Sequence, residues 1–429
     1  MEIIVNPPRG SWQSLCTRNI PDDTDIEKAV EQILQHVKVE GDAALTRYAA
    51  QFDRFTGDSL RVSDDEIESG AAAVTPEVAD AIRAAADNIA RFHRAQLPEP
   101  VEVTTTVGVV CSQKAVAIRR VGLYIPGGRA PLFSTVLMLG IPAQLAGCRE
   151  VILCTPQNGT NPIAPEILFA ARLCGIKNIY RIGGAQAIAA MAYGTDTIPA
   201  VDKIFGPGNR FVTKAKQLVS RVTAIDMPAG PSEVMVVADH TSCPTFVAAD
   251  MLSQAEHGPD SQAIAVCPSE AIASEISKEV ARLAATLPRA ESIAGSLAHS
   301  RIIVLPDRRS MIEFANLYSP EHLILSVDSP WEAAAEISAA GSVFIGNFSP
   351  ESAGDYASGT NHTLPTSAWA RSMSGVNIDS FMHKITFQEL TPEGLKGLSG
   401  VITTMAHAEG LDAHALAVDV RTAYNQRLS

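Results

Sequence analysis

Residues 178–193 read NIYRIGGAQAIAAMAY, which is a short apolar strand, a Gly183-Gly184 turn and an alanine-rich helix in direct succession. The same order recurs after Lys203–Phe205, where Gly206-Pro207-Gly208 forms the turn and a helix is expected from Arg210. Further apolar segments of strand length, each beside a helical stretch, lie at 150–154, 233–237, 263–266, 302–305, 322–327 and 343–345. Strands and helices that alternate in this way predict α/β layers built around parallel sheets.

The alternating segments form two blocks, at about 121–229 and 230–378, which predict two sheet domains. Residues 22–98 have apolar side chains at helical spacing, and Val101–Arg120 alternate and are β-branched, so the latter predict a strand or hairpin. The tail, Thr391–Ser429, is expected to form a small helical appendage.

Size and composition exclude several classes of protein. The chain has 429 residues, enough for two or more domains with their own cores. Its net charge of -13 argues against nucleic-acid binding, which requires a basic surface facing the phosphates. The N-terminal residues lack the pattern of a signal peptide, and no apolar run reaches membrane-spanning length. The seven scattered cysteines contain no C-x-x-C pair, which is typical of reduced thiols, so we expect a cytoplasmic protein whose metal ligands, if any, are nitrogen and oxygen.

Three glycine turns follow predicted strands, at Ile125–Gly128, Gly183–Gln186 and Gly206–Asn209. Glycine at the carboxyl end of a strand lets backbone amides approach an anionic ligand. None of the three turns matches G-x-G-x-x-G or the P-loop. The pattern therefore fits a dinucleotide site, but taken alone it favours turns that only reverse the chain.

A first polar group lies on the helix expected over Thr245–Glu256. Asp250, Gln254 and His257 are spaced i, i+4 and i+7, which places them on one helical face. A glutamine and a histidine at this spacing can share a metal ion. Taken alone, such a pair is more often a hydrogen-bonded or solvated face, and glutamine is an uncommon zinc ligand.

A second polar group, Glu321-His322, directly precedes the apolar strand expected over 323–327. A carboxylate beside an imidazole suits proton transfer, because histidine titrates near neutrality and burial raises the pKa of a glutamate toward it. A helix cap with a surface charge explains the same residues equally well.

The densest polar segment is Ser349–His362, which follows an apolar strand and is expected to be a loop. Its small and polar residues have no evident packing purpose, so Asp355 and His362 are predicted to be ligands or proton carriers. His414, in the tail, matters only if the tail reaches this cluster in the same chain or in a partner. Ser232 lies outside any G-x-S-x-G motif, which argues against a hydrolase.

Taken together, these segments resemble the L-histidinol dehydrogenase family over essentially the whole chain. The resemblance is specific because seven blocks occur in one order: Val121–Gly128, Gly183–Ile188, Phe205–Asn209, Asp226–Glu233, Leu252–His257, Ser319–Leu323 and Glu351–His362.

The resemblance implies a fold of two incomplete Rossmann-like α/β/α domains with small helical N- and C-terminal segments, assembled as an intertwined homodimer. It implies an N-terminal arm over 1–20 and a first α/β domain over 21–120 and 230–378 that holds the metal and catalytic residues. The second α/β domain, 121–229, would contact NAD, and the helical tail, 379–429, would complete the partner's site.

The resemblance also implies one zinc ion per subunit, bound by Gln254, His257, Asp355 and His414. Zinc would position the substrate rather than activate water. From the residues themselves, a ligand set without thiolate is chemically feasible for zinc and would tolerate Mn(II) as well.

The implied reaction is the four-electron oxidation of L-histidinol to L-histidine through L-histidinal, with two NAD, as the final steps of L-histidine biosynthesis. His322 is similar to the family's acid–base residue, and Glu321 to the base that activates water on the aldehyde. The implied substrate contacts are Ser232, Gln254, His257, His322, Asp355, His362, Glu409 and His414. The implied NAD contacts are Tyr124, Gln186 and Asn209.

Two other functions compete with this one. The same residues would serve a related dehydrogenase that acts on a different polar alcohol. They would also suit a non-catalytic protein that binds a metal or a small molecule.

Overall fold

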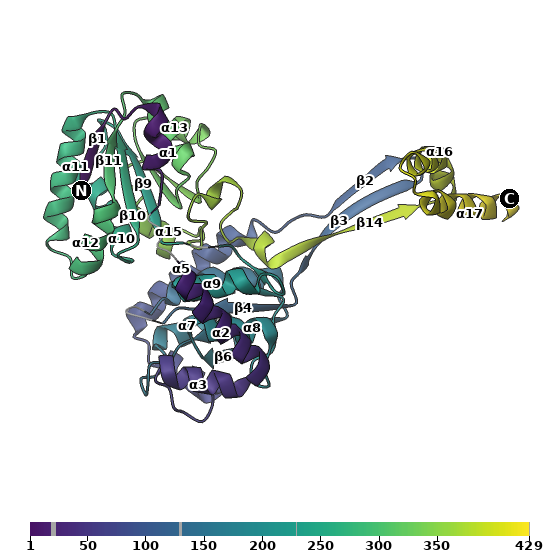
Figure 1. The fold of residues 1–429 in the computed structure, drawn as a ribbon, viewed down its shortest axis with the longest axis horizontal. Coiled ribbons are helices and arrows are strands. Elements are labelled where there is room, and N and C mark those ends of the chain that lie inside the picture. The colour runs from purple at the N-terminus through teal and green to yellow at the C-terminus, as the bar shows by residue number, and fades with distance from the viewer. Residues whose placement is uncertain (19–22, 128–130, 229, 429) are drawn as a thin grey trace. The chain divides into compact units, whose positions relative to one another are not determined.

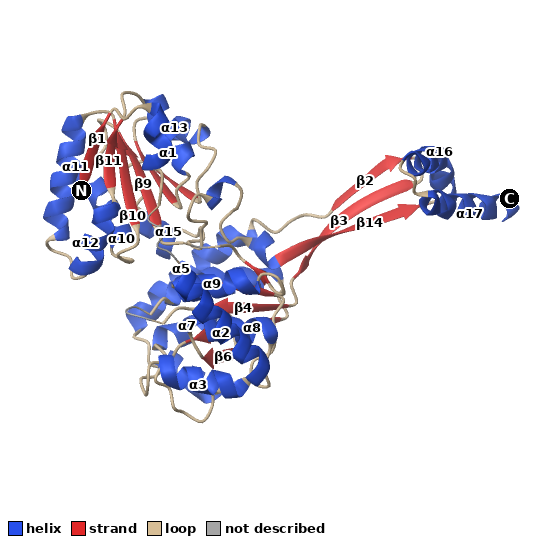
Figure 2. Cartoon of the chain, viewed as in Figure 1, coloured by secondary structure: helices blue, strands red, loops and turns tan. Residues whose placement is uncertain are grey.

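The computed structural model describes residues 1–18, 23–127, 131–228 and 230–428, so Gly128 and Ala229 of the quoted segments lie outside the described residues. The chain divides into two compact units. Unit 1 comprises Met1–Gln96 and Ile118–Phe381, and unit 2 comprises Leu97–Ala117 and Met382–Ser429. Unit 1 contains two parallel sheets covered by helices, which confirms the predicted α/β class (Figure 1, Figure 2).

The first sheet of unit 1 has five parallel strands in the order β6-β5-β4-β7-β8. Numbered along the chain, these strands follow the spatial order 3-2-1-4-5, which is the doubly wound Rossmann order without its sixth strand. The order reverses between β4 and β7, whose carboxyl ends are therefore the expected ligand position. The strands are β4 (Arg120–Tyr124), β5 (Glu150–Thr155), β6 (Asn178–Arg181), β7 (Lys203–Phe205) and β8 (Ala224–Ile225).

Eight helices pack with this sheet or with one another beside it. On one face, α2 and α3 share a buried core with α8 and α9. In the second group, α5 packs on α6, α6 on α7 and α7 on α4. The helices are α2 (Thr24–Glu40), α3 (Asp42–Phe52), α4 (Asp64–Ala72), α5 (Pro76–Arg94), α6 (Phe133–Ala146), α7 (Pro165–Leu173), α8 (Gly184–Tyr193) and α9 (Arg210–Val219).

These contacts differ from the domain division expected from the sequence, which grouped residues 21–120 with 230–378. Helices α2 and α3 instead share a core with the sheet of residues 120–225, and α4 and α5 pack on its helices α7 and α6. The reason is that an amphipathic helix shows in its sequence that one face is buried, but not which sheet buries it.

The second sheet of unit 1 has six parallel strands in the order β1-β11-β10-β9-β12-β13. Its last five strands repeat the 3-2-1-4-5 order, and β1 is added at the edge beside β11. The N-terminal residues expected to form an arm therefore contribute a strand. The strands are β1 (Glu2–Val5), β9 (Glu233–Ala238), β10 (Gln262–Cys267), β11 (Arg301–Val304), β12 (His322–Ser326) and β13 (Ser342–Ile345).

Both faces of this sheet are buried, which explains why its strands are apolar throughout. Along β9, Val234 and Val236 belong to the core shared with α10 and α11, whereas Met235 and Val237 belong to the core shared with α13. Figure 1 shows these helices on the two sides of the strands. The covering helices are α1 (Trp12–Leu15), α10 (Pro244–Ala255), α11 (Glu270–Ala284), α12 (Ala290–His299), α13 (Arg308–Tyr318) and α14 (Pro330–Ala335); α15 (Glu351–Tyr356) packs on α10.

Unit 2 is an antiparallel sheet in the order β14-β3-β2 with two helices that pack on each other. Its strands are β2 (Val101–Thr106), β3 (Val109–Ala117) and β14 (Met382–Leu390), and its helices are α16 (Pro392–Ala408) and α17 (Asp412–Leu428). The hairpin expected from the β-branched alternation is confirmed, and so are the tail helices. The tail expected over 379–429 additionally contains β14, whose nine residues pair with β3. Within the described ranges, every helix is too short or too polar to cross a membrane.

Candidate active site

The polar cluster of unit 1 lies at the amino ends of β9 and β12, the two strands between which the order of the six-stranded sheet reverses. His322 is the first residue of β12 and pairs in register with Val234, next to Glu233 at the start of β9. Helix α10 follows β9 and brings Gln254, near its last turn, to the backbone of Glu233. The cluster thus lies at the edge opposite to the one that open α/β sheets usually use for ligands.

The predicted acid–base pair is buried and held by the backbone of one residue. Glu321 and His322 are 6% and 3% exposed. The Glu321 carboxylate accepts from the backbone N–H of Glu233 at 2.8 Å, and His322 Nδ1 lies 3.2 Å from the Glu233 carbonyl oxygen. Because a carbonyl only accepts, Nδ1 carries the proton in the neutral ring and Nε2 is left as the acceptor. Among the described residues Nε2 has no hydrogen-bond partner, and Asp355 Oδ1 lies 3.6 Å away.

The surroundings of Glu321 and His322 shift the pKa of both side chains. Burial raises the pKa of Glu321 to about 8, against the opposing effect of the His322 ring. Burial alone lowers the pKa of His322, but the carboxylates of Glu321 and Glu351 outweigh it and raise the pKa. The raised pKa of Glu321 lies near the range where acid–base catalysts operate, whereas the raised pKa of His322, about 10, favours the protonated ring in the absence of a nearby cation.

Glu233 owes its fixed position to Arg18. The Arg18 guanidinium binds both carboxylate oxygens of Glu233, at 3.0 Å from Nε and 2.9 Å from Nη2. It also donates to the carbonyl oxygen of Tyr318 at 2.7 Å and lies over the Tyr318 ring. The same Glu233 carboxylate accepts from the backbone N–H of Ser367 at 2.8 Å. A bidentate ion pair buried in this way fixes the backbone that orients Glu321 and His322.

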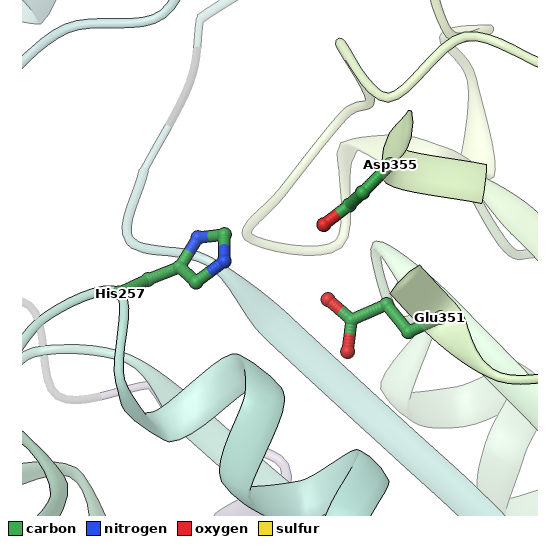
Figure 3. Close-up of side chains that lie close together, drawn as sticks. All are labelled: His257, Glu351 and Asp355. Carbon is green, nitrogen blue, oxygen red and sulfur yellow. The ribbon is translucent and has the colours of Figure 1, made fainter. Parts of the chain in front are cut away.

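A candidate metal centre adjoins the His322 ring. His257, Glu351 and Asp355 each offer one ligand atom, and these atoms lie within 4.8 Å of one another (Figure 3). Burial opposes ionisation of Asp355, but the facing His322 ring outweighs it and lowers the pKa of the carboxyl. One imidazole and two carboxyl groups form a nitrogen and oxygen donor set that fits Zn²⁺ or Mn²⁺.

The Gln254 side chain contacts this centre by hydrogen bonds to Glu351. Its amide, fully buried, lies between the Glu351 carboxylate and the backbone N–H of Glu233. A carboxylate only accepts and an N–H only donates, so the amide nitrogen faces Glu351 and the amide oxygen faces Glu233. In this orientation the nitrogen donates to both Glu351 oxygens, one of them at 3.1 Å, and the oxygen accepts from Glu233 at 3.1 Å.

The segment 349–362, expected to be a loop, contains helix α15 at Glu351–Tyr356. The helix has a packing role that the sequence did not indicate, since Glu351 is 1% exposed. His362 contacts the backbone of Asp355. Its Nδ1 is 2.9 Å from the Asp355 carbonyl oxygen, and its Nε2 is 3.3 Å from Thr135 Oγ1. Asp355 and His362 are therefore neighbours, as their predicted common role requires.

A cavity of about 670 Å³ opens beside the metal ligands. Its wall includes His257 from the metal centre, the predicted substrate contact Ser232 and the predicted NAD contact Asn209. Residues predicted to contact the metal, the substrate and the cofactor therefore line one cavity.

The other two predicted NAD contacts, Tyr124 and Gln186, lie next to glycine turns. The Tyr124 hydroxyl, at the end of β4, accepts from the backbone N–H of Gly184 at 3.1 Å. Gln186 is 1% exposed, and its Nε2 has no hydrogen-bond partner among the described residues. Gly206 has φ +124°, and a Cβ there would lie 2.1 Å from the Tyr124 carbonyl oxygen. The unpaired Gln186 amide lies in the first turn of α8, after β6, and the Gly206 turn, which requires glycine, follows β7 at the reversal of the strand order. Both lie beyond carboxyl ends of the sheet and fit a bound polar cofactor.

Glu409 and His414 belong to unit 2. Glu409 is the C-cap residue of α16, and His414 lies in the first turn of α17; both are exposed. The candidate metal centre consists of unit 1 residues, whereas these two predicted contacts belong to unit 2.

The sequence assigned no role to Glu351, Glu233 or Arg18. A signal for Glu351 was present, because it precedes Asp355 by four residues and so shares its helical face. Arg18 had no local signal, since its partner Glu233 is 215 residues away.

Comparison with known proteins gives a consistent result. The profile of the histidinol dehydrogenase family matches residues 16–422. Histidinol dehydrogenase from Bacteroides thetaiotaomicron is 52% identical over 422 residues, covering 98% of this chain and 99% of the relative. That from Vibrio vulnificus is 50% identical over 422 residues, covering 96% and 97%.

A solved structure agrees with the sequence matches. The crystal structure of histidinol dehydrogenase from Elizabethkingia anophelis superposes with a TM-score of 0.97 at 50% identity, covering 99% of both chains. The match spans the fold as well as the polar segments. The chain therefore belongs to the histidinol dehydrogenase family, whose members are NAD-dependent oxidoreductases of histidine biosynthesis.

Proposed function

We propose that this chain oxidises L-histidinol to L-histidine through L-histidinal, with one zinc ion per subunit and two NAD, as the last steps of histidine biosynthesis. The observation that carries the proposal is the His322 ring, whose Nδ1 is held by a carbonyl and whose Nε2 faces Asp355 without a hydrogen bond. An acceptor nitrogen aimed into a cluster of metal-type ligands is the arrangement that alcohol oxidation on a held substrate requires.

Gln254, His257 and Asp355 would hold the zinc ion, together with His414 supplied by a partner subunit. Zinc, when bound, would fix the imidazole and amine of the substrate and so place its hydroxyl. Ser232 and His362 would complete the pocket on one side. The carboxylates of Asp355, Glu321 and Glu409 suit the positive charge of the substrate's amine.

In the first oxidation, His322 Nε2 would accept the hydroxyl proton as hydride leaves the same carbon for NAD. The tautomer required for this step is the one favoured by the Glu233 carbonyl at Nδ1. Against the effect of burial, the carboxylates of Glu321, Glu351 and Asp355 raise the pKa of His322. A cation held at Asp355 would lower this pKa and so favour the neutral ring.

In the second oxidation, Glu321 would remove a proton from water as the water adds to the aldehyde. A carboxyl raised to a pKa of about 8 by burial is a stronger base once ionised than an ordinary glutamate. The resulting hydrate would lose a hydride to the second NAD and a hydroxyl proton to His322 Nε2, which gives the acid.

NAD would contact Tyr124, Gln186 and Asn209 at the carboxyl ends of the five-stranded sheet. The unpaired Nε2 of Gln186 and the close turn at Gly206 support this position. Asn209 both caps α9, by accepting from two backbone N–H groups at 3.1 Å, and lines the cavity that includes His257.

The decisive assay is the yield of NADH from L-histidinol, together with the metal content of the purified protein. We expect two NADH per L-histidinol and about one zinc ion per chain. The same protein assayed with other amino alcohols would distinguish a related dehydrogenase of different specificity. No NADH from L-histidinol would contradict the proposal.

We also propose that the active protein is a homodimer in which unit 2 completes the partner's site. Unit 2 exposes many large apolar side chains, as expected of a surface that another chain covers. On α17, Leu416, Val420 and Tyr424 recur at i, i+4 and i+8, on one face, and are 59%, 51% and 64% exposed. Exposed Val101 and Val103 on β2 and Ile385 and Phe387 on β14 extend the apolar surface.

Sharing of sites between subunits predicts complementation. Subunits carrying His414→Asn and subunits carrying His322→Gln should each be inactive alone, but a heterodimer of the two would contain one intact site. Mixing after partial unfolding should therefore restore about a quarter of the wild-type rate at random assortment. Heterodimers confirmed by differential tagging but without activity would show that each site is built from one chain.

A cytoplasmic location and the absence of nucleic-acid partners stay predictions. The first is supported by seven cysteines that are all free thiols, and the second by the net charge of -13.

A further inference from the structure

We propose that Glu351 is a positioning residue that orients the Gln254 amide so that its oxygen serves the metal, and that Glu351 is not itself a ligand. The proposal rests on the function proposed above, because it takes Gln254 as a zinc ligand. It explains why a carboxylate that belongs to no predicted ligand set is buried inside the candidate metal centre.

The Glu351 carboxylate accepts hydrogen bonds from two residues of helix α10. Both of its oxygens face the Gln254 amide nitrogen, and Oε2 also accepts from Ser253 Oγ at 3.0 Å. The side chain is 1% exposed, so water does not compete for these hydrogen bonds. Two donor groups, the Gln254 amide nitrogen and the Ser253 hydroxyl, thus bind one buried carboxylate and hold the amide in place.

The orientation of the amide is the property that matters for a metal. A glutamine coordinates through its oxygen, and its two ends are sterically alike, so only hydrogen bonding selects the end that faces the ion. Glu351 accepts from the nitrogen and thereby excludes the opposite orientation. The oxygen keeps a second lone pair beyond its bond with Glu233.

Asp250 gives this arrangement a second connection. It lies one helical turn before Gln254, and its carboxyl faces the backbone N–H of Glu351. The three α10 residues at 250, 253 and 254 thus all engage Glu351, which ties the end of α10 to the start of α15. The helical face on which the sequence placed Asp250 and Gln254 is in this way a binding face for Glu351.

The test is a double-mutant cycle on zinc affinity, measured by competition between the zinc-loaded protein and a chromophoric chelator. Glu351→Gln, which keeps size and loses the pure acceptor, should weaken zinc binding by about 10–100-fold, as is usual when the partner of a ligand is removed. Gln254→Ala should also weaken it. If Glu351 acts through Gln254, the double variant should bind zinc no more weakly than Gln254→Ala alone.

Two further variants control for packing. Ser253→Ala removes one hydrogen bond to Glu351 without changing charge, and should weaken zinc binding by only about 2–10-fold. Glu332→Gln is the matched control, because Glu332 also lies in the first turn of a short helix, α14, but is exposed and forms an ion pair with Arg308. It should leave zinc affinity unchanged.

The outcomes separate this inference from the function on which it rests. Unchanged zinc affinity in Glu351→Gln overturns the inference, and so do losses that multiply in the double variant, since these would make Glu351 an independent ligand. Unchanged affinity in Gln254→Ala would instead overturn the proposed ligand set, and the inference with it.

Discussion

Replacement of His322 by glutamine is expected to lower kcat for L-histidinol by at least about 100-fold while zinc stays bound, because a general acid–base residue contributes that much or more. Glutamine can still donate to the Glu233 carbonyl from which His322 Nδ1 is 3.2 Å away, so the local backbone should be retained. What is lost is the acceptor nitrogen that faces Asp355. The measurement is steady-state NADH formation together with zinc content.

A suitable control is His240→Gln, since His240 is exposed in the turn after β9 and outside the cluster. It should retain wild-type kcat. A His322→Gln protein with near-wild-type kcat would exclude proton transfer by this ring and would favour a non-catalytic binding protein. Loss of zinc together with activity would instead point to a role in assembling the metal centre.

Replacement of Glu321 by glutamine is expected to uncouple the two oxidations. Without a base for water, the aldehyde step should slow by at least about 100-fold, whereas the alcohol step retains His322. The yield should fall from two NADH per L-histidinol toward one, with L-histidinal accumulating. The glutamine oxygen can keep the bond from the Glu233 N–H, so this result would reflect lost basicity rather than lost structure.

The pH dependence provides an independent check on Glu321. A base acts in its ionised form, and burial raises the pKa of this carboxyl to about 8. In the wild type, oxidation of L-histidinal should therefore rise as pH increases through the pKa of Glu321, and the rise should be absent in Glu321→Gln. Two NADH per L-histidinol at the wild-type rate in the variant would contradict the assignment.

The sheets could be predicted from sequence because a strand buried on both faces must be apolar along its length. That condition is visible in 233–237 and 322–327, and it gives two blocks of parallel strands. The grouping of 21–120 could not be predicted in the same way. The apolar stripe of α2 fits any sheet, and only the structure shows it packed with α8 and α9.

Local spacing predicted parts of the site and missed others. Asp250 and Gln254 were placed on one helical face because four residues make about one turn, and both engage Glu351. Contacts between residues far apart in the sequence have no local sequence pattern, so the ion pair of Arg18 and Glu233 could not be predicted. The position of Glu321 and His322 at the amino end of their strand could be predicted, because they directly precede its apolar residues. The general preference of ligands for carboxyl ends fits the glycine turns and would not have identified this edge as a site.

The pairing of β1 with β11 has a consequence for biosynthesis of the chain. Glu2 pairs with Arg301, so the N-terminal strand stays without its neighbour until about 300 residues have been made. At ordinary rates of translation this delay is roughly 15–60 s, during which an apolar strand edge is open to chaperones or to aggregation. Helices α2 to α9 and their sheet are complete by residue 225, although Ile378–Phe381 packs on α6 later. We therefore expect the five-stranded sheet and its helices to fold cotranslationally. The Glu321–His322 pair should become ordered only near the end of synthesis.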